Sequence, residues 1–562
     1  MLHLPAELVI AILRYIPLST LTSLPSVSRE WQSFCQVNES NLYHNAAILH
    51  GFVSSSVVYS ELATTLSRRA LAGVSGWKSF CYAQICIEKS WRGDEPSSVT
   101  LHHSAGDRVH RIKVDEERGF LIVTSRRGGI SVIDLYSDNE LWSLPNDYVH
   151  PYAHCEYGAG YLIFDRGGPH GEKEVWRHSA DVEDDPSRPT FAAPDDSQLN
   201  AGSQAETTHG PPSRGHFRPW AVLRPPALTR AFRFVHPSLI AATRDSLFIW
   251  DIPTGELIQI IRDTQISPEG LGSEEDLGEI NYVEISAQHA FVCGGNTLRA
   301  FSRATGRCVL DVPSSQVSYG KNAFFLCADG SHEGLGLSSA ILKPQPVEHG
   351  LASLPTDRKR LIDEFVAVHV SACGSHLVAV LASSRLVIIP FFQRVIAGNV
   401  SMWDIALDIQ VGSPMSVARY LAFENGRVAL ATGTGLFIIS LDWESTLEES
   451  ESPHISIRRA AWFNVPVSLS CITCLQMTRT GIYLNWAGGW DNEEEERRRH
   501  FEAEDLVPEL GFETLFNLSL SDKQRVINMP NGDQVVQLFE PGESGRQTSS
   551  KLFSIDLTPL EY

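Results

Sequence analysis

The chain lacks the short motifs that usually mark a catalytic or cofactor site. It contains no phosphate-binding P-loop, no HExxH zinc motif and no GxSxG nucleophile elbow. Cys471 and Cys474 have the spacing of a metal or redox pair, but they lie in an apolar, strand-like stretch without a second pair nearby. His102 and His103 are adjacent but have no evident further ligands. We therefore expect no catalytic residue, no metal and no cofactor.

Arginine recurs in the short turns that separate apolar segments after residue 98. A guanidinium group can form a bidentate pair with a carboxylate or a phosphate. If the turns meet on one rim of the folded chain, they would form a basic surface suited to an acidic or phosphorylated peptide. The alternative is that these arginines are solvated or pair with nearby aspartates. The candidate rim consists of Arg126, Arg127, Arg166, Arg244, Asn296, Arg385 and Trp486, with Thr434 in the remaining turn.

Seven similar apolar segments would supply the strands that position these turns. The shorter intervals between their first residues approach the roughly 40–45 residues of a four-stranded propeller blade. We predict an all-β propeller of about seven blades at residues 98–562, with six or eight blades as alternatives. Ser98–His103 would close the ring as the outer strand of the last blade. The segments are Ile130–Leu135, Glu174–Arg177, Leu247–Ile252, Leu298–Ser302, Leu386–Phe391, Leu436–Leu441 and Leu552–Leu557.

The longer intervals contain insertions near residues 178–229, 332–362 and 489–550. The first is rich in serine and proline, which predicts a disordered loop. The third includes Glu493–Glu496 followed by Arg497–Arg499, which favours a solvated helix with ion pairs. The formal net charge of −21 makes general binding to nucleic acid or to an anionic membrane a poor expectation, although the acidic loops contribute to that charge.

The N-terminal part of the chain has a different pattern, with helical spacing of its apolar residues. Leu8, Ile12 and Ile16 predict one short helix that ends at Pro17. A second predicted helix runs from about Leu21 to Trp31, and a third follows up to residue 51. We therefore divide the chain into an all-α module at residues 1–50, a largely helical linker at 51–97 and the propeller. A module this small usually docks on a partner or a neighbouring domain.

Two resemblances follow from these residues. Trp250-Asp251 before Pro253-Thr254-Gly255 resembles the tryptophan–aspartate repeat, although most other units lack the pair, so the propeller looks like a degenerate WD-like one. Leu4-Pro5-x-Glu7-Leu8, then Ile12-Leu13 and Val27-Ser28-x-x-Trp31, resemble an F-box. The F-box resemblance implies that the Skp adaptor, and through it cullin, is a partner. The adaptor-binding residues would be Leu4, Pro5, Leu8, Ile12, Leu24, Val27 and Trp31.

The resemblance implies a non-catalytic substrate-recognition subunit of a Skp–cullin–F-box ubiquitin ligase, whose propeller holds a cargo protein. The alternatives are a propeller scaffold that uses its F-box outside a ligase, and a propeller enzyme with a helical extension. Scattered cysteines in apolar stretches and the absence of a signal peptide or an 18-residue apolar span favour a cytoplasmic or nuclear protein.

Overall fold

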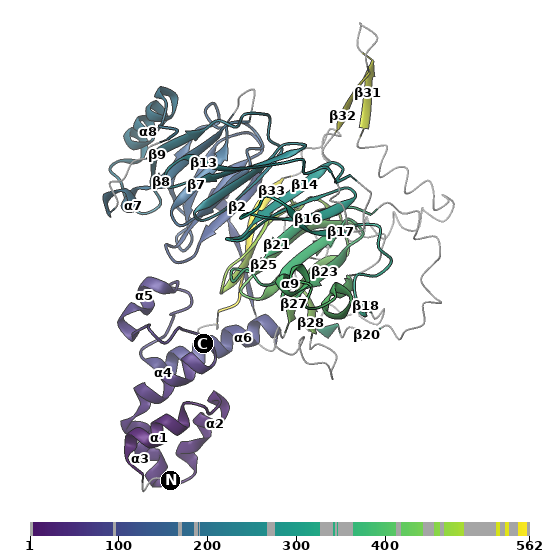
Figure 1. Ribbon diagram of the computed structural model, residues 1–562. Coiled ribbons are helices and arrows are strands. Elements are labelled where there is room, and N and C mark those ends of the chain that lie inside the picture. The colour runs from purple at the N-terminus through teal and green to yellow at the C-terminus, as the bar shows by residue number, and fades with distance from the viewer. Residues whose placement is uncertain are drawn as a thin grey trace, which may run out of the picture.

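The protein consists of a small helical region and a ring of β-sheets, as a computed structural model shows (Figure 1). No helix in the part of the chain that the structure describes is long and apolar enough to cross a membrane. The structure describes residues 4–93, 97–166, 171–184, 189, 191–266, 276–325, 341–342, 345–346, 363–411, 417–441, 455–460, 463, 466–487, 524–528, 534–538 and 549–558.

The first fifty residues form α1 (Ala6–Leu13), α2 (Leu18–Ser23), the 3-10 turn η1 (Leu24–Ser26), α3 (Arg29–Val37) and α4 (Glu39–Leu49). The single second helix predicted from Leu21 to Trp31 is wrong, because that segment is divided into α2, η1 and α3. Proline has no backbone N–H to donate to a helix, and Pro25 lies in η1. Ser28 is extended, and its side chain accepts a hydrogen bond from Trp31 N (3.2 Å), so it caps a new helix.

The linker is helical mainly in its second half. It contains η2 (Tyr59–Glu61), the short α5 (Leu62–Thr65) and α6 (Trp77–Arg92). Helix α6 packs on α4 through its apolar side. It ends at Gly93, whose left-handed backbone (φ 78°) is a common way to terminate a helix.

Seven four-stranded blades follow and form the propeller, which confirms the predicted number. Each of the seven apolar segments found in the sequence is the third strand of a blade. Blade 1 contains β2 (Val109–Asp115), β3 (Phe120–Ser125), β4 (Ile130–Asp134) and β5 (Glu140–Leu144); blade 2 contains β6 (Cys155–Gly158), β7 (Tyr161–Asp165), β8 (Lys173–His178) and β9 (Phe217–Leu223); blade 3 contains β10 (Ala231–Val235), β11 (Ser238–Ala242), β12 (Ser246–Asp251) and β13 (Glu256–Arg262).

The other blades follow the same order from the inner to the outer strand. Blade 4 contains β14 (Ile280–Ile285), β15 (His289–Gly294), β16 (Thr297–Ser302) and β17 (Cys308–Pro313); blade 5 contains β21 (Phe365–Val370), β22 (Leu377–Leu381), β23 (Arg385–Ile389) and β24 (Leu407–Gln410); blade 6 contains β25 (Ala418–Glu424), β26 (Arg427–Thr432), β27 (Gly435–Leu441) and β28 (Ile455–Arg459); blade 7 contains β29 (Leu475–Met477), β30 (Gly481–Ala487), β33 (Ser550–Asp556) and β1 (Ser98–His102).

Blade 7 closes the ring, because it combines strands from both ends of the propeller sequence. Strand β1 pairs antiparallel with β33, and Val99 lies opposite Ile555. The predicted ring closure is therefore confirmed, and β33 is not left as an exposed sheet edge.

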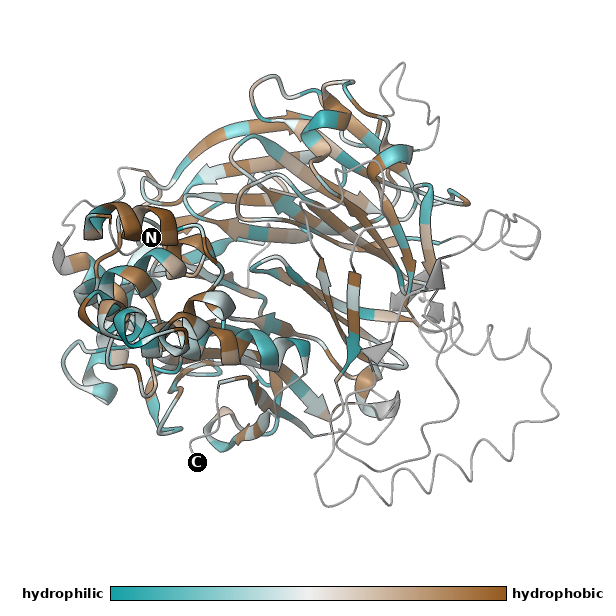
Figure 2. Ribbon diagram, turned by 90° about the horizontal axis from the view of Figure 1, so that it is seen from below, coloured by the Kyte–Doolittle hydropathy of each residue, from teal (hydrophilic) through white to brown (hydrophobic). Residues whose placement is uncertain are grey.

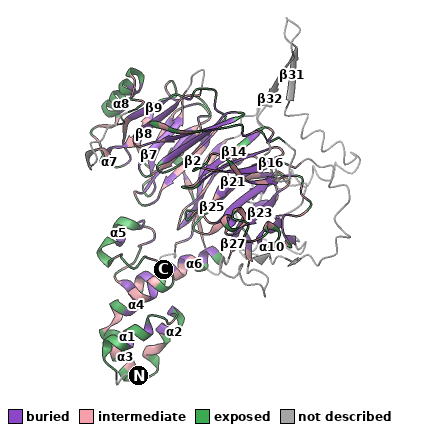
Figure 3. Cartoon of the chain, in the orientation of Figure 1, coloured by how far each residue is buried: buried purple, intermediate pink, exposed green. Residues whose placement is uncertain are grey.

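Most of the apolar residues pack between neighbouring blades. The strands are mostly buried, whereas α1, α2 and α3 are largely exposed (Figure 3). Hydrophobic residues line the strands over most of their length (Figure 2). One apolar cluster continues from the helical region through α6 into blades 6 and 7, so the two parts share a core.

The described residues of the insertion at 178–229 form regular structure, so the prediction of a disordered loop is wrong for them. It contains α7 (Ser179–Asp184), α8 (Asp196–His209) and the outer strand β9. Asp195 caps α8, and Gly202 allows the helix to approach Pro219, because a Cβ there would lie 2.7 Å from the proline ring. Small residues thus replace the large apolar residues that a packed helix usually shows.

The other insertions lie largely outside the described residues, as does the charge run at 493–499. Within 332–362, β20 (Gln345–Pro346) extends blade 5 together with the preceding β18 (Asn322–Phe325), and β19 (Ile341–Leu342) extends blade 6. Strands β31 (Gln524–Asn528) and β32 (Gln534–Leu538) form a separate hairpin.

Candidate functional site

The helical region presents large apolar side chains to solvent. The exposed fractions are 44% for Leu4, 52% for Leu8, 41% for Ile12 and 66% for Val27. Burying such side chains is favourable by about 1.5–3 kcal/mol each. Four exposed residues of this kind in one small module make it a candidate interaction surface.

Helix α1 is apolar on two sides, which explains why part of it stays uncovered. Val9 and Leu13 are buried against the rest of the module, whereas Leu8 and Ile12 point away from it. Of the seven residues predicted to bind an adaptor, the structure leaves Leu4, Pro5, Leu8, Ile12 and Val27 exposed, and it leaves Leu24 and Trp31 half-buried against the core.

Helix α6 is fixed to the propeller by its last turns. Trp91 is buried, and its indole Nε1 donates to the carbonyl of Arg479 at 2.9 Å. Arg427 lies over the Trp91 ring and pairs with Glu88 at 2.5 Å. Arg458 donates to the carbonyls of Ser90 and Trp91. Helix α6 is therefore held by apolar packing, by arginines of blade 6 and by a backbone carbonyl next to blade 7.

These anchors identify the face of the ring on which the helices lie. Arg427 begins β26 and Arg479 lies between β29 and β30, so both are at the turn between the first and second strands of a blade. In an antiparallel blade, the turn between the second and third strands is at the opposite end of the strands. The face that carries the candidate rim is therefore opposite to the face that holds α6.

Three of the candidate rim arginines are open to a partner. Arg126 and Arg127 lie between β3 and β4, and Arg244 lies between β11 and β12. Arg127 and Arg244 are exposed and Arg126 is partly exposed. No ion pair of these three side chains occurs within the described parts of the chain.

Other members of the predicted rim already have partners. Arg166 pairs with Asp195, the cap of α8, at 2.5 Å, and lies 3.4 Å from Glu174. The side chain of Asn296 donates to Asp276 (2.7 Å). These two residues occupy the predicted turns, but they hold the propeller's own loops.

Arg385 and Trp486 are buried, so their assignment to a cargo-binding rim is wrong. Arg385 is the first residue of β23. Its Nε donates to Oδ1 of Asp408, on the adjacent strand β24, at 2.7 Å. Its guanidinium also donates to two backbone carbonyls. Trp486 lies within β30, which continues past the expected turn, and it packs against Phe463 in the core.

The same face carries an exposed apolar residue in five successive connections between blades. Such a connection runs from the outer strand of one blade to the inner strand of the next, so it ends on the face of the rim. Together with the three open arginines, these side chains combine apolar and cationic groups on one surface. The five residues are Tyr152, Leu228, Ile266, Val317 and Val417.

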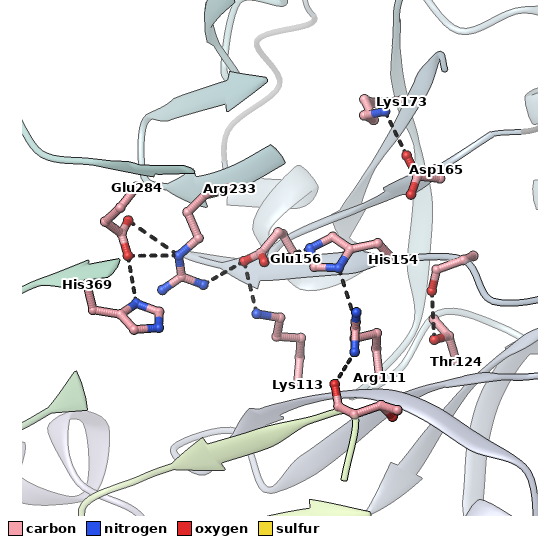
Figure 4. Close-up of polar contacts among 12 residues, drawn as sticks. Arg111, Lys113, Thr124, His154, Glu156, Asp165, Lys173, Arg233, Glu284 and His369 are labelled. Carbon is pink, nitrogen blue, oxygen red and sulfur yellow. Dashed lines mark hydrogen bonds and ion pairs between the residues drawn. The ribbon is translucent and has the colours of Figure 1, made fainter. Parts of the chain in front are cut away.

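A chain of buried charges inside the ring was missed by the sequence reading. Glu156 on β6 accepts from Lys113 on β2 (2.9 Å) and from Arg233 on β10 (2.8 Å). Arg233 also lies 3.3 Å from Glu284 on β14, which pairs with His369 on β21 at 2.8 Å (Figure 4). Each residue is on the innermost strand of its blade, so these polar contacts connect blades 1 to 5.

Electrostatics explain how this chain tolerates burial. Burial alone raises the pKa of Glu156, but Lys113 and Arg233 outweigh it and hold that pKa well below its ordinary value. Burial likewise opposes the charge on Arg233, whereas Glu284 and Glu156 hold its pKa well above the ordinary value. The chain therefore acts as a set of charged links between blades, because all of its members are paired.

The comparison with known families agrees with the geometry of the helical region. Residues 1–47 match the F-box-like family model, and no curated protein matches the chain. An F-box in front of a propeller is typical of non-catalytic adaptors. The chain thus carries an F-box-like domain at residues 1–47, followed by an all-β propeller of seven blades.

Proposed function

We propose that the chain is the substrate-recognition subunit of a Skp–cullin–F-box ubiquitin ligase. The observation that carries this proposal is the exposed apolar surface of Leu4, Leu8, Ile12 and Val27 within the residues that match the F-box-like model. In this function the surface binds the Skp adaptor, and the adaptor connects the chain to cullin.

The propeller would hold the cargo on the face that carries Arg126, Arg127 and Arg244. Two observations support this assignment: the face is opposite to α6, and it combines open arginines with exposed apolar residues. A cargo segment with acidic or phosphorylated residues beside large apolar ones complements such a surface. The chain would contribute proximity rather than chemistry, by raising the effective concentration of cargo lysines near the transferred ubiquitin.

Co-purification of the Skp adaptor and cullin with the full chain tests the first step. Leu8→Asp with Val27→Asp should abolish adaptor binding, because both substitutions place a charge in the buried interface. Val37→Asp is the matched control, since Val37 is also an exposed valine but is not one of the predicted adaptor residues. Unchanged adaptor recovery with the double variant would contradict the proposal, and adaptor recovery without cullin would favour the scaffold alternative.

Affinity capture of cargo with a form that lacks adaptor binding tests the second step. Arg126→Glu, Arg127→Glu and Arg244→Glu together should remove captured cargo, because they reverse the charge of the open rim. Arg307→Glu is a suitable control: Arg307 is exposed and lies between β16 and β17, on the opposite face. Cargo captured equally by the triple variant and the control would exclude the rim as the binding surface.

A further inference from the structure

The outer strands of the blades differ in how their free edges are covered. Blades 5 and 6 gain β18, β20 and β19, which pair beyond the fourth strand. Helix α8 packs against the outer strands β5 and β9 of blades 1 and 2. In the described structure, β13 of blade 3 pairs only with β12, so its other edge is open. An open edge presents backbone donors and acceptors to any strand that can align with it.

Strand β13 also carries the side chains that favour pairing with another strand. Its sequence is ELIQIIR, and every second residue is exposed: Glu256, Ile258 (45%), Ile260 (37%) and Arg262. Ile258 has no partner residue in β12, because the register shifts there. The open edge β17 of the next blade lacks this feature, since it ends at Pro313 and exposes no large apolar residue.

The sequence of β13 is complementary to itself. If two copies of the strand run antiparallel and are centred on Gln259, Glu256 lies opposite Arg262 of the second copy. Ile258 then lies opposite Ile260. Cross-strand pairs of opposite charge and of β-branched residues each stabilise a sheet by about 0.2–1 kcal/mol relative to alanine pairs. Neither Glu256 nor Arg262 forms an ion pair within the described residues, so both charges are available.

We propose that β13 is a self-association edge, through which two copies of this chain pair antiparallel. The two four-stranded blades would join into one continuous sheet across a twofold axis, and each copy would contribute the same surface. A single seven-residue strand gives a small contact, so the dimer should be reversible. This proposal does not depend on the F-box or on the cargo.

Sedimentation of the full chain across a wide range of concentration tests this proposal. The mean mass should rise from 62.2 kDa toward twice that value. Ile260→Lys should keep the chain at the mass of the monomer, because the lysine of each copy then lies opposite Ile258 of the other copy and replaces an apolar pair. Val235→Lys is the control: Val235 is also an exposed apolar residue of blade 3, but it lies on the innermost strand.

A charge-swap series identifies the register. Glu256→Arg alone and Arg262→Glu alone should each weaken the dimer at least severalfold, because like charges then face each other. The double variant restores both pairs and should recover the dimer. The variants should melt at the wild-type temperature, since all these residues are exposed. A wild-type chain that stays at the mass of the monomer, or a dimer that none of these β13 substitutions weakens, would overturn the proposal.

Discussion

Replacing Arg233 with methionine should destabilise the propeller far more than replacing an arginine at its surface. Arg233 lies 2.8 Å from Glu156 and 3.3 Å from Glu284, and both carboxylates are buried. Methionine preserves much of the packing but leaves two carboxylates near each other without their shared cation. Removing one partner of a buried ion pair usually costs about 3–5 kcal/mol, and we expect a loss in this range.

The loss should depend on pH, with a sign that follows from the carboxylates. In the wild type the pKa values of Glu156 and Glu284 lie below their ordinary value, so the stability from these groups is present at neutral pH and decreases as the pH falls through the folded-state pKa. Without Arg233 both pKa values rise, and protonation relieves the repulsion. Arg233→Met should therefore lose most stability near pH 8 and clearly less near pH 5, relative to the wild type at the same pH.

Thermal unfolding at both pH values measures this effect, with Arg244→Met as the matched control. Arg244 belongs to the same blade, but it is exposed and has no ion pair in the described residues. The control should change the unfolding temperature little at either pH. Equal shifts for the two variants, or a shift of Arg233→Met that does not depend on pH, would refute the reasoning that buried charges link the blades.

Three other substitutions test single contacts. Ser28→Ala removes the cap of α3 and should lower the stability of the helical region by about 1 kcal/mol, measurable as faster amide exchange in α3. Trp91→Phe removes the hydrogen bond to Arg479 and should cost about 1 kcal/mol or more in chemical denaturation of the full chain. Gly128→Ala should cost about 1–3 kcal/mol in the same assay, because φ is 91° and the added Cβ would lie 2.5 Å from the carbonyl oxygen of Val149.

The strands could be predicted from the sequence because each third strand is a short, continuous apolar run. Such runs are typical of strands buried on both faces, and Ile130–Leu135 and Leu552–Leu557 are clear examples. Helix α8 was missed because its sequence has no such apolar pattern. Its buried face consists of Gln198, Ala201 and Ala205, and these residues give no apolar periodicity.

The site residues were harder to predict, because a position in a turn does not determine the environment of a side chain. Arg244 and Arg385 were both assigned to the turn before a third strand, yet one is exposed and the other is buried beside Asp408. A signal for the buried chain did exist at one position: Arg233 lies in the middle of the otherwise apolar inner strand β10. Its partners could not be assigned, because the contacts join different blades and depend on ring closure.

The attachment of α6 decides how the two proposed surfaces can work together. Because α6 shares one apolar core with blades 6 and 7 and pairs with Arg427, rotation of the helical module would break buried contacts. The open rim is separated from this attachment by the length of a blade strand, roughly 17–23 Å for five to seven residues. In the proposed function, a cargo bound at the rim would be held on the far side of the propeller from α6, and its lysines would have to reach past the ring toward the F-box side. Cargo selection should then depend on the distance between its binding segment and its lysines as well as on the affinity of that segment.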